Sequence, residues 1–349
     1  MPPEQQIINV NKLVVLPIIR CLCHDERIKQ ISLSLKSNCK FYFMLFAIIA
    51  PPTPTQKWKE NFEKIAPHIS LVIGSKTKYP EEVLCAMVWN QPKGSLTEFK
   101  NLKLIFAMGA GVDHVLKDET IPYHIPICRV VDPQMAFSMT NYILMALLNH
   151  HRSWYEFQAS QNKKHWAQFE FFERPIRVGV LGIGHLGMDA ANKIHHLGFP
   201  VVGFSNSPKK TDFPSYTGKE FHKFIEQINV LICTVPHTPK THALLNYKLF
   251  QKLKEPTYLI NVSRGSVQVE KDIIKALDEG LLSGAFLDVF EKEPLPKNSP
   301  LWDHPKVKIT PHIASLTYPK ESTYQVLDCF DRLEKGLPLP QEVSRKKMY

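Results

Sequence analysis

The sequence predicts an α/β protein with two domains, the larger of which contains a doubly wound parallel sheet. Short apolar stretches alternate with amphipathic segments along most of the chain, which is typical of parallel strands joined by helices. A glycine-rich turn lies near the middle, between an apolar stretch and a helical segment. The length of 349 residues is enough for two hydrophobic cores.

The glycine-rich turn begins where the apolar strand expected at residues 176–181 ends. Gly182, Gly184 and Gly187 follow with the spacing GxGxxG, and residues 186–197 have the apolar spacing of a helix. This order is the context of a dinucleotide site, in which the glycines permit the turn, the approach of a pyrophosphate and close helix packing. The alternative is that the glycines only turn the chain. The predicted contacts of the turn are Gly182, Gly184, His185, Leu186 and Gly187.

Composition narrows the class of protein. The net charge of +10 is spread along the chain rather than gathered in a patch, so a nucleic-acid partner is not expected. No apolar run reaches the roughly 20 residues that span a bilayer, which argues against a membrane partner. The seven cysteines are scattered, and Cys21 and Cys23 lack a second ligand pair, so no metal site is expected. Reduced thiols and a cytoplasmic location fit this pattern best.

The first domain is expected to begin at Met44. Its loops at residues 89–94 and 108–113 follow the carboxyl ends of strands, where ligands bind in open α/β sheets. Free amides around Gly109 and Gly111 suit a carboxylate, although a tight turn is the alternative. The expected strands are 44–50, 70–73, 85–89 and 104–107, with helices at 56–65 and, leading to the second domain, 135–154.

The apolar residues within residues 1–43 have no clear periodic spacing, and this segment fits poorly with the alternation of strands and helices expected in the remaining chain. Two interpretations stay open: an ordinary N-terminal extension outside the fold, or a natural product that begins at Met44. No signal peptide is expected, because a clean charged-then-apolar layout with a small-residue cleavage site is lacking.

The second domain continues the alternation after the glycine-rich turn. Further strands are expected at 201–204, 230–234, 258–261, 284–287 and 307–309, with helices at 221–227, 248–253 and 271–279. The loop after the first of these strands is where the ribose of a dinucleotide is recognised, and it contains no acidic residue. Hydroxyls, an amide and lysines favour a 2′-phosphate, hence NADP, with NAD or a plain polar turn as alternatives. The predicted contacts are Ser205, Asn206, Ser207 and Lys209.

Three polar side chains follow later strands of the second domain: Arg264, Glu293 and His312. They can converge on one edge of the sheet. A guanidinium holds a carboxylate and polarises a neighbouring carbonyl, and an imidazolium donates a proton. A carboxylate beside the imidazole orients it. Singly, each has a structural explanation; together they suit hydride transfer to a 2-oxoacid.

The chain resembles the D-isomer-specific 2-hydroxyacid dehydrogenases, and within them the bacterial glyoxylate/hydroxypyruvate reductase A branch. The resemblance runs from about Met44 to Tyr349. It rests on motifs in family order: Val88-Trp89, Met108-Gly-Ala-Gly-Val-Asp113, Val180-Leu-Gly-Ile-Gly-His-Leu-Gly187, Val235-Pro-His-Thr-Pro239, Asn261-Val-Ser-Arg-Gly265, Leu287-Asp-Val-Phe290, Glu293-Pro-Leu-Pro296 and Thr310-Pro-His312.

The resemblance implies residue roles. Arg264 binds substrate, His312 is the acid/base and Glu293 orients it, while Asp288 holds the nicotinamide carboxamide. Substrate contacts are implied at Trp89, Ala110, Gly111 and Arg264. Nicotinamide-ribose contacts are implied at Val235, Pro236 and Thr238.

The resemblance also implies the architecture. It implies a Rossmann cofactor domain at 149–316 and a smaller flavodoxin-like substrate domain at 44–148 plus 317–349. It also implies a homodimer formed through the cofactor domain. Asn206 and Pro208 depart from the pattern, because they stand where the branch often has arginines. Asn141 stands where an acid is common, a change with no interpretation.

The resulting expectation is an NADPH-preferring reduction of glyoxylate to glycolate and of hydroxypyruvate to D-glycerate. Trp89 narrows the predicted pocket, which favours such small 2-oxoacids. The alternatives are a dehydrogenase for a larger D-2-hydroxyacid and a dinucleotide-sensing binding protein without catalysis. Arg264, Glu293 and His312 argue against the sensor, because a sensor needs none of them for chemistry.

Overall fold

The computed structural model describes residues 44–348 except 52 and 169, so the expectations about residues 1–43 lie outside the described part. The two sheets belong to one compact unit that begins at Leu45. Within the described residues, no helix is both long and apolar enough to cross a membrane.

The first sheet has five parallel strands in the order β2-β1-β3-β4-β5. This is the flavodoxin-like order. Its elements are β1 (Met44–Ile49), α3 (Gln56–Ile65), β2 (Ile69–Ile73), the 3-10 helix η1 (Pro80–Glu82), β3 (Val83–Val88), β4 (Leu104–Ala107), α4 (Asp113–Leu116) and β5 (Ile127–Arg129).

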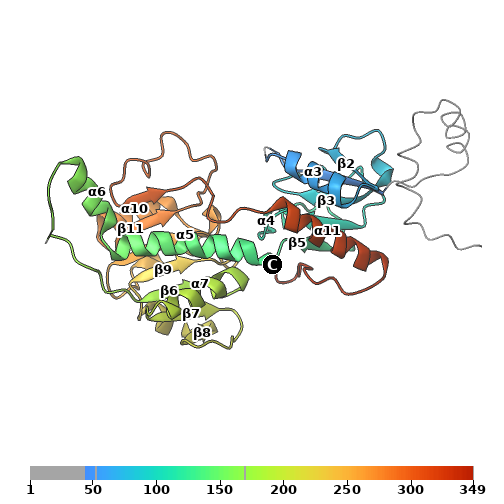
Figure 1. Ribbon diagram of the computed structural model, residues 1–349. Helices are drawn as coiled ribbons and strands as arrows, with labels where there is room; N and C mark the ends of the chain where they lie inside the picture. The colour runs from blue at the N-terminus through green and yellow to red at the C-terminus, as the bar shows by residue number, and fades with distance from the viewer. Residues whose placement is uncertain (1–43, 52, 169, 349) are drawn as a thin grey trace, which may run out of the picture. The chain divides into compact units, whose positions relative to one another are not determined.

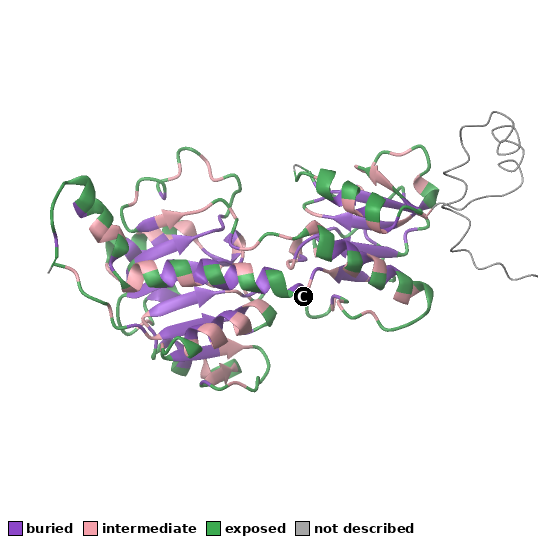
Figure 2. Cartoon of the chain, viewed as in Figure 1, coloured by how far each residue is buried: buried purple, intermediate pink, exposed green. Residues whose placement is uncertain are grey.

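The central strands of this sheet are continuous apolar runs because both of their faces are covered. All four residues of β4 are buried, as are five of the six in β1, and Figure 2 shows these strands as buried. On one face, α3 packs Trp58 and Phe62 into the core, and the Phe62 ring meets Phe46 edge-on at 6.1 Å. The prediction of a helix at 56–65 is confirmed.

The C-terminal helix α11 (Pro319–Glu334) returns to the first sheet and lies beside α3 (Figure 1). The Phe330 ring contacts the ring of Phe46 on β1 at 4.8 Å between centroids. Beyond the helix, Glu342 forms an antiparallel bridge with Cys128 of β5, and Val343 enters the same core. Two segments far apart in the sequence thus build one hydrophobic core.

The second sheet has seven parallel strands in the order β12-β11-β10-β9-β6-β7-β8. The order reverses at β6, as in the doubly wound Rossmann sheet, so the predicted fold class is confirmed. Its elements are α5 (Pro133–His151), α6 (Trp154–Asn162), β6 (Val178–Leu181), α7 (His185–His196), β7 (Val201–Ser205), β8 (Ser215–Thr217), η2 (Gly218–Glu220), α8 (Phe221–Ile225), β9 (Val230–Cys233), α9 (Tyr247–Phe250), β10 (Thr257–Asn261), η3 (Gly265–Val267), α10 (Glu270–Asp278), β11 (Leu282–Leu287) and β12 (Val307–Ile309).

The long helix expected at 135–154 begins earlier and ends earlier. It starts at Pro133, because the Asp132 carboxylate caps it by accepting from the amide of Gln134 at 2.8 Å. It ends at His151, because Ser153 adopts a left-handed conformation with φ of 54° that breaks the helix before α6. The expected helix therefore corresponds to α5, and α6 is a separate helix that was not predicted.

Candidate active site

The glycine-rich turn joins β6 to α7 in the geometry that a dinucleotide needs. Gly182 has a φ of 108°, and a Cβ atom there would lie 2.9 Å from the backbone nitrogen of Val235. A Cβ atom on Gly187 would lie 2.2 Å from the carbonyl oxygen of Gly182, so only glycine lets α7 pack this closely. At Gly184 nothing lies within 4 Å of the corresponding position. That open side, at the N-terminus of α7, fits a pyrophosphate.

The loop after β7 exposes the groups predicted to meet a 2′-phosphate. The Ser205 hydroxyl donates to the carbonyl oxygen of Ser207 at 2.7 Å, which tightens the turn. Asn206, Ser207 and Lys209 are all exposed. A cationic, acid-free loop at the end of the second Rossmann strand fits a phosphate better than a bare ribose hydroxyl.

The loop at Val235–Thr238 borders the glycine-rich turn. Val235 is buried against Gly182, whereas Pro236 is exposed. The Thr241 hydroxyl donates to the carbonyl oxygen of Pro236 at 2.6 Å and accepts from the amide of Thr238 at 2.8 Å. These bonds fix the loop beside the open face of the turn.

Arg264 follows β10 and reaches the loops of the first sheet. Its Nε donates to a carboxylate oxygen of Asp113 at 3.0 Å, and its Nη1 donates to the carbonyl oxygen of Ser263 at 2.8 Å. A Cβ atom on Gly111 would lie 1.5 Å from Nη2, so the guanidinium rests directly on that glycine. The guanidinium carbon also lies 5.9 Å from the centre of the Trp89 ring.

The Asp113 carboxylate stays ionised in this setting. Its burial raises the pKa, but the charge and hydrogen bond of Arg264 outweigh the burial, and the pKa is lowered overall. Sequence reasoning gave Asp113 no role. The only feature of the sequence that could have indicated such a role is its position, two residues after the second glycine of the Gly109–Gly111 loop.

The predicted substrate loop is held from two sides. A Cβ atom on Gly109 would lie 2.5 Å from the Trp89 ring, so that ring packs directly against the loop. Behind the loop, Nη1 of Arg129 donates to the carbonyl oxygen of Ala110 at 3.1 Å. Arg129, at the end of β5, is a second supporting residue that sequence reasoning missed, and nothing in its local sequence pointed to this contact.

His312 and Glu293 form the pair that the sequence predicted to act together. The His312 Nδ1 lies 2.7 Å from Glu293 Oε2, and the other carboxylate oxygen accepts from the amide of Phe290 at 3.0 Å. Because a carboxylate only accepts, Nδ1 carries the proton in this bond and Nε2 is left for a substrate. Burial raises the pKa of Glu293, but the hydrogen bond and charge of His312, with the charge of Arg264, lower it overall.

Asp288 lies beneath the His312 loop, with 1% of its surface exposed. One carboxylate oxygen accepts from the Thr310 hydroxyl at 2.6 Å and from the amide of Ile313 at 2.8 Å. The other accepts from the amide of Ala314 at 2.8 Å. Burial raises the pKa of Asp288. Its predicted contact with a carboxamide stays a prediction.

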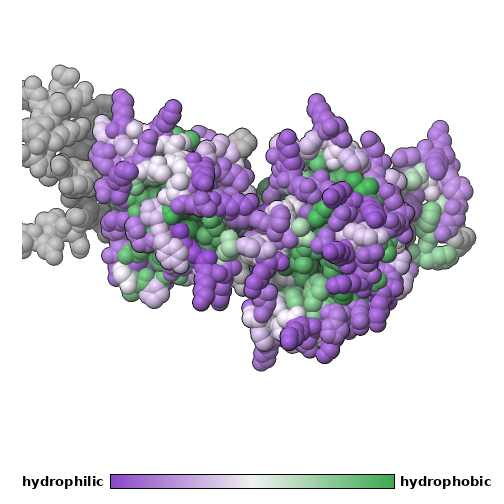
Figure 3. All heavy atoms as spheres, turned by 180° about the vertical axis from the view of Figure 1, so that it is seen from behind, coloured by the Kyte–Doolittle hydropathy of each residue, from purple (hydrophilic) through white to green (hydrophobic). Residues whose placement is uncertain are grey.

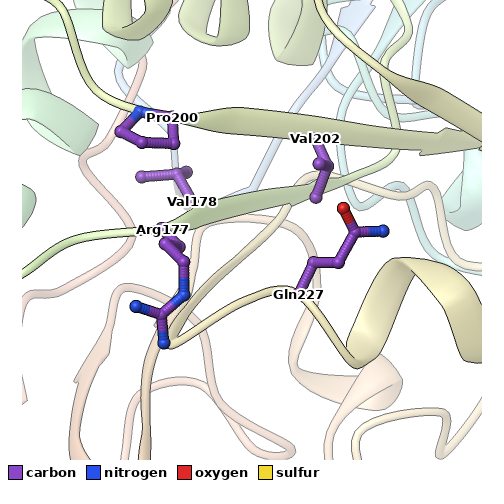
Figure 4. Close-up of a pocket in the computed structure, with 5 residues that line it drawn as sticks. All are labelled: Arg177, Val178, Pro200, Val202 and Gln227. Carbon is purple, nitrogen blue, oxygen red and sulfur yellow. The ribbon is translucent and has the colours of Figure 1, made fainter.

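A separate cavity of about 240 Å³ lies at the amino ends of β6 and β7, as Figure 4 shows. Arg177 and Val178 line one side, and Pro200, Val202 and Gln227 complete it. The glycine-rich turn follows the carboxyl end of β6, at the opposite edge of the sheet. This cavity is therefore not the predicted dinucleotide site.

The residues thus form three groups: the glycine-rich turn with its bordering loop, Arg264 with Trp89 and Gly111, and His312 with Glu293. A dinucleotide site, a carboxylate-binding guanidinium and a carboxylate-oriented imidazole can reduce the carbonyl of a 2-oxoacid. This combination defines a nicotinamide-dependent oxidoreductase class.

Comparisons with known proteins identify the family. Residues 144–314 match the family model described as D-isomer specific 2-hydroxyacid dehydrogenase, NAD binding domain. The chain is 38% identical over 259 residues to glyoxylate/hydroxypyruvate reductase A of Yersinia enterocolitica, covering 72% of this chain and 83% of that protein. It is 36% identical over 307 residues to the protein of the same name from Salmonella enteritidis, covering 86% and 98%. The chain belongs to the D-isomer-specific 2-hydroxyacid dehydrogenase family.

Solved structures of similar proteins support the same family assignment. An NADPH-dependent glyoxylate/hydroxypyruvate reductase from Sinorhizobium meliloti, in complex with NADP and sulfate, has a TM-score of 0.82 at 31% identity. A D-isomer specific 2-hydroxyacid dehydrogenase from Xanthobacter autotrophicus, in complex with NADPH, has a TM-score of 0.81 at 34% identity. Each alignment covers 87% of this chain and 99% of the other.

Proposed function

We propose that this protein is an NADPH-preferring reductase of small 2-oxoacids, which converts glyoxylate to glycolate and hydroxypyruvate to D-glycerate. The observation that carries the proposal is the His312–Glu293 pair at 2.7 Å, within electrostatic range of the Arg264 guanidinium. The names of the relatives and the NADP-bound neighbours support the same reaction.

In this mechanism Arg264 binds the carboxylate of the substrate and polarises its carbonyl oxygen. Nε2 of His312 donates a proton to that oxygen, while Glu293 keeps the imidazole oriented and supports its positive charge. When bound, NADPH would supply a hydride for the carbonyl carbon; with the proton from His312, the keto acid would become a 2-hydroxyacid. The proton lost by His312 is then replaced from solvent.

The cofactor residues are assigned as the sequence predicts. The open side of Gly184, with the N-terminus of α7 at His185, Leu186 and Gly187, is assigned to the pyrophosphate. The exposed loop after β7 is assigned to the 2′-phosphate. Asp288, Val235, Pro236 and Thr238 are assigned to the nicotinamide half, as the resemblance implies.

The substrate is assigned to the loop between Trp89 and Arg264. The Trp89 ring fills the space over Gly109, and the Arg264 guanidinium fills the space over Gly111, so both large groups border the loop that contains Ala110. A tight pocket discriminates against added methylenes by about 1–3 kcal/mol each. This supports two- and three-carbon acids over the larger D-2-hydroxyacids.

We also propose a homodimer formed through the cofactor domain at 149–316, with the substrate domain at 44–148 and 317–349. Large apolar side chains are exposed on and after α6: Trp154 by 50%, Trp166 by 86% and Phe172 by 74%. Figure 3 shows hydrophobic side chains at the surface where α6 lies, at the right of the view. Such exposure is typical of a protein interface. The free thiols of the four described cysteines suit the cytoplasm.

The test is the loss of reduced-nicotinamide absorbance when glyoxylate or hydroxypyruvate is added, with NADPH and NADH compared in parallel. Faster turnover with NADPH supports both the reaction and the role of the loop after β7. Turnover with NADH alone contradicts the assignment of that loop. No turnover with either cofactor, despite cofactor binding, contradicts the proposed substrates.

A further inference from the structure

The backbone of His312 is held in an unusual conformation. Its φ is 56°, in the left-handed region that residues other than glycine seldom occupy. Such a conformation costs free energy and persists only where surrounding contacts enforce it. The His312 amide donates to the Asp288 carbonyl oxygen at 2.8 Å, and the amides of Ile313 and Ala314 donate to the Asp288 carboxylate. Asp288 therefore fixes the loop that presents the imidazole.

A chain of hydroxyl groups leads from Asp288 to helix α5. The Thr310 hydroxyl bonds to Asp288 Oδ1 at 2.6 Å, and the Tyr142 hydroxyl bonds to the Thr310 oxygen. The number of available protons determines which hydroxyl group donates and which accepts in each of these hydrogen bonds. The carboxylate can only accept, so Thr310 gives its single proton to Asp288, and Tyr142 must donate to Thr310.

The two ends of this hydroxyl chain, Tyr142 and Asp288, are buried. Tyr142 is 8% exposed, and its ring meets the Phe286 ring of β11 edge-on at 5.4 Å between centroids. Burial raises the pKa of Tyr142, so its hydroxyl remains a donor at neutral pH. Successive hydrogen bonds in a low-dielectric interior polarise and strengthen one another. Tyr142 therefore connects the packed core of α5 and β11 to the loop of His312.

We propose that Tyr142 is a positioning residue for the reaction assigned to this site: through Thr310 and Asp288, its hydroxyl holds His312 in the conformation that proton transfer requires. The proposal rests on the proposed function. It goes beyond that function because Tyr142 is assigned neither to the substrate nor to the cofactor. It acts on the orientation of the acid, and so on kcat rather than on substrate binding.

The first test compares two buried hydroxyl groups. Tyr142→Phe removes the first donor of the chain, and we expect kcat for glyoxylate to fall about 3- to 10-fold, as for the loss of one hydrogen bond. KM and NADPH affinity should change less than about twofold. Tyr258→Phe is the matched control, because Tyr258 is also buried in the second sheet and its hydroxyl has no hydrogen-bond partner among the described residues. That variant should keep the wild-type kcat.

A double-mutant cycle tests whether the hydroxyl groups act as one chain. Thr310→Val breaks the chain at its middle, so adding Tyr142→Phe to it should lower kcat no further. Thr310→Ser keeps a hydroxyl at the same place and should restore most of the kcat that Thr310→Val loses. A role in general stability would not produce this rescue together with an unchanged KM.

A measurement without substrate or cofactor separates this proposal from the proposed function. Hydrogen exchange at the amides of Ile313 and Ala314, measured on the ligand-free protein, should be faster in Tyr142→Phe than in Tyr258→Phe. Equal exchange and equal kcat in the two variants would overturn the proposal, as would independent effects of Tyr142→Phe and Thr310→Val. An inactive wild-type protein would instead overturn the proposed function and leave the exchange comparison valid.

Discussion

At the scale of single residues, Arg264 depends on the carboxylate of Asp113, the first residue of α4. Asp113 accepts from its Nε at 3.0 Å, and both side chains are largely shielded from water. Breaking a shielded ion pair by removing one partner costs more than the pair contributes, because the remaining charge is left uncompensated. The position of the guanidinium over Gly111 therefore depends on Asp113.

Asp113→Ala should lower kcat/KM for glyoxylate on the order of 10–100-fold, because a misplaced guanidinium no longer aligns the carboxylate and the carbonyl. Asp113→Asn keeps the shape and an acceptor, so its effect should be smaller. Glu226→Ala, which removes an exposed pair with Lys254, is the control and should leave kcat/KM unchanged. Wild-type kcat/KM in Asp113→Ala would contradict this role.

His150 makes stability depend on pH. Its ring stacks on Tyr258 at 3.9 Å, and burial, with the nearby positive charges of Arg174 and His151, lowers its pKa from 6.5 to about 3. The folded protein thus keeps His150 neutral while the unfolded chain binds a proton below pH 6.5. The stability that this group contributes is complete above pH 6.5 and is lost as the pH falls toward 3.

His150→Phe preserves the stacking and removes the titration. Its free energy of unfolding, measured with denaturant, should therefore fall less between pH 7 and pH 5 than that of the wild type, by roughly 1–2 kcal/mol. Parallel pH profiles for the two proteins would show that His150 is not responsible.

At the scale of elements, two glycines of the turn between β6 and α7 have different roles: Gly184 leaves space for a ligand, and Gly187 allows close helix packing. Gly184→Ala places a methyl group in the open space assigned to the pyrophosphate, so the variant should fold normally but bind NADPH about tenfold more weakly or worse. Gly187→Ala forces a methyl group against the Gly182 carbonyl and should also lose about 1–3 kcal/mol of stability. Calorimetry and NADPH titration of the two variants check both statements. Normal NADPH binding by Gly184→Ala would contradict the assignment.

The elements found from sequence were those with a strong local signal. Buried parallel strands such as β1 and β9 are continuous apolar runs, and their positions were predicted to within a residue. Edge strand β8 has no buried residue and β5 has only three residues, so neither shows a readable period. The family resemblance implied that residues 317–349 belong with the first domain, but helix α11 itself was not predicted, because its buried face meets a core formed at the other end of the chain.

The predicted site residues, like the predicted elements, were those with a strong local signal in the sequence. Arg264, Glu293 and His312 stand in motifs beyond apolar strands, and the structure pairs His312 with Glu293 as predicted. Asp113 and Tyr142 were given no role from the sequence, because the roles we propose for them rest on contacts across the fold. Such contacts with residues more than 150 positions away leave no trace in local spacing.

At the scale of the whole molecule, the exposed aromatic side chains after α6 predict self-association. The protein should have about twice the monomer mass of 40.1 kDa in light scattering. Replacing Trp166 and Phe172 with serine should shift it toward the monomer, since it removes the exposed apolar surface. Replacing the exposed Tyr79, on the first sheet's side, is the control. A monomeric wild type would contradict the proposed dimer.

The assignment of this site to 2-oxoacid reduction is tested by comparing NADPH oxidation by the wild type and by His312→Gln after glyoxylate is added. Loss of the acid should lower kcat/KM on the order of 10²–10⁴-fold. NADPH binding, followed by fluorescence, should stay within about twofold, because the variant leaves the glycine-rich turn intact. A His312→Gln protein that reduces glyoxylate at the wild-type rate would contradict the assignment of this site as a 2-oxoacid reductase.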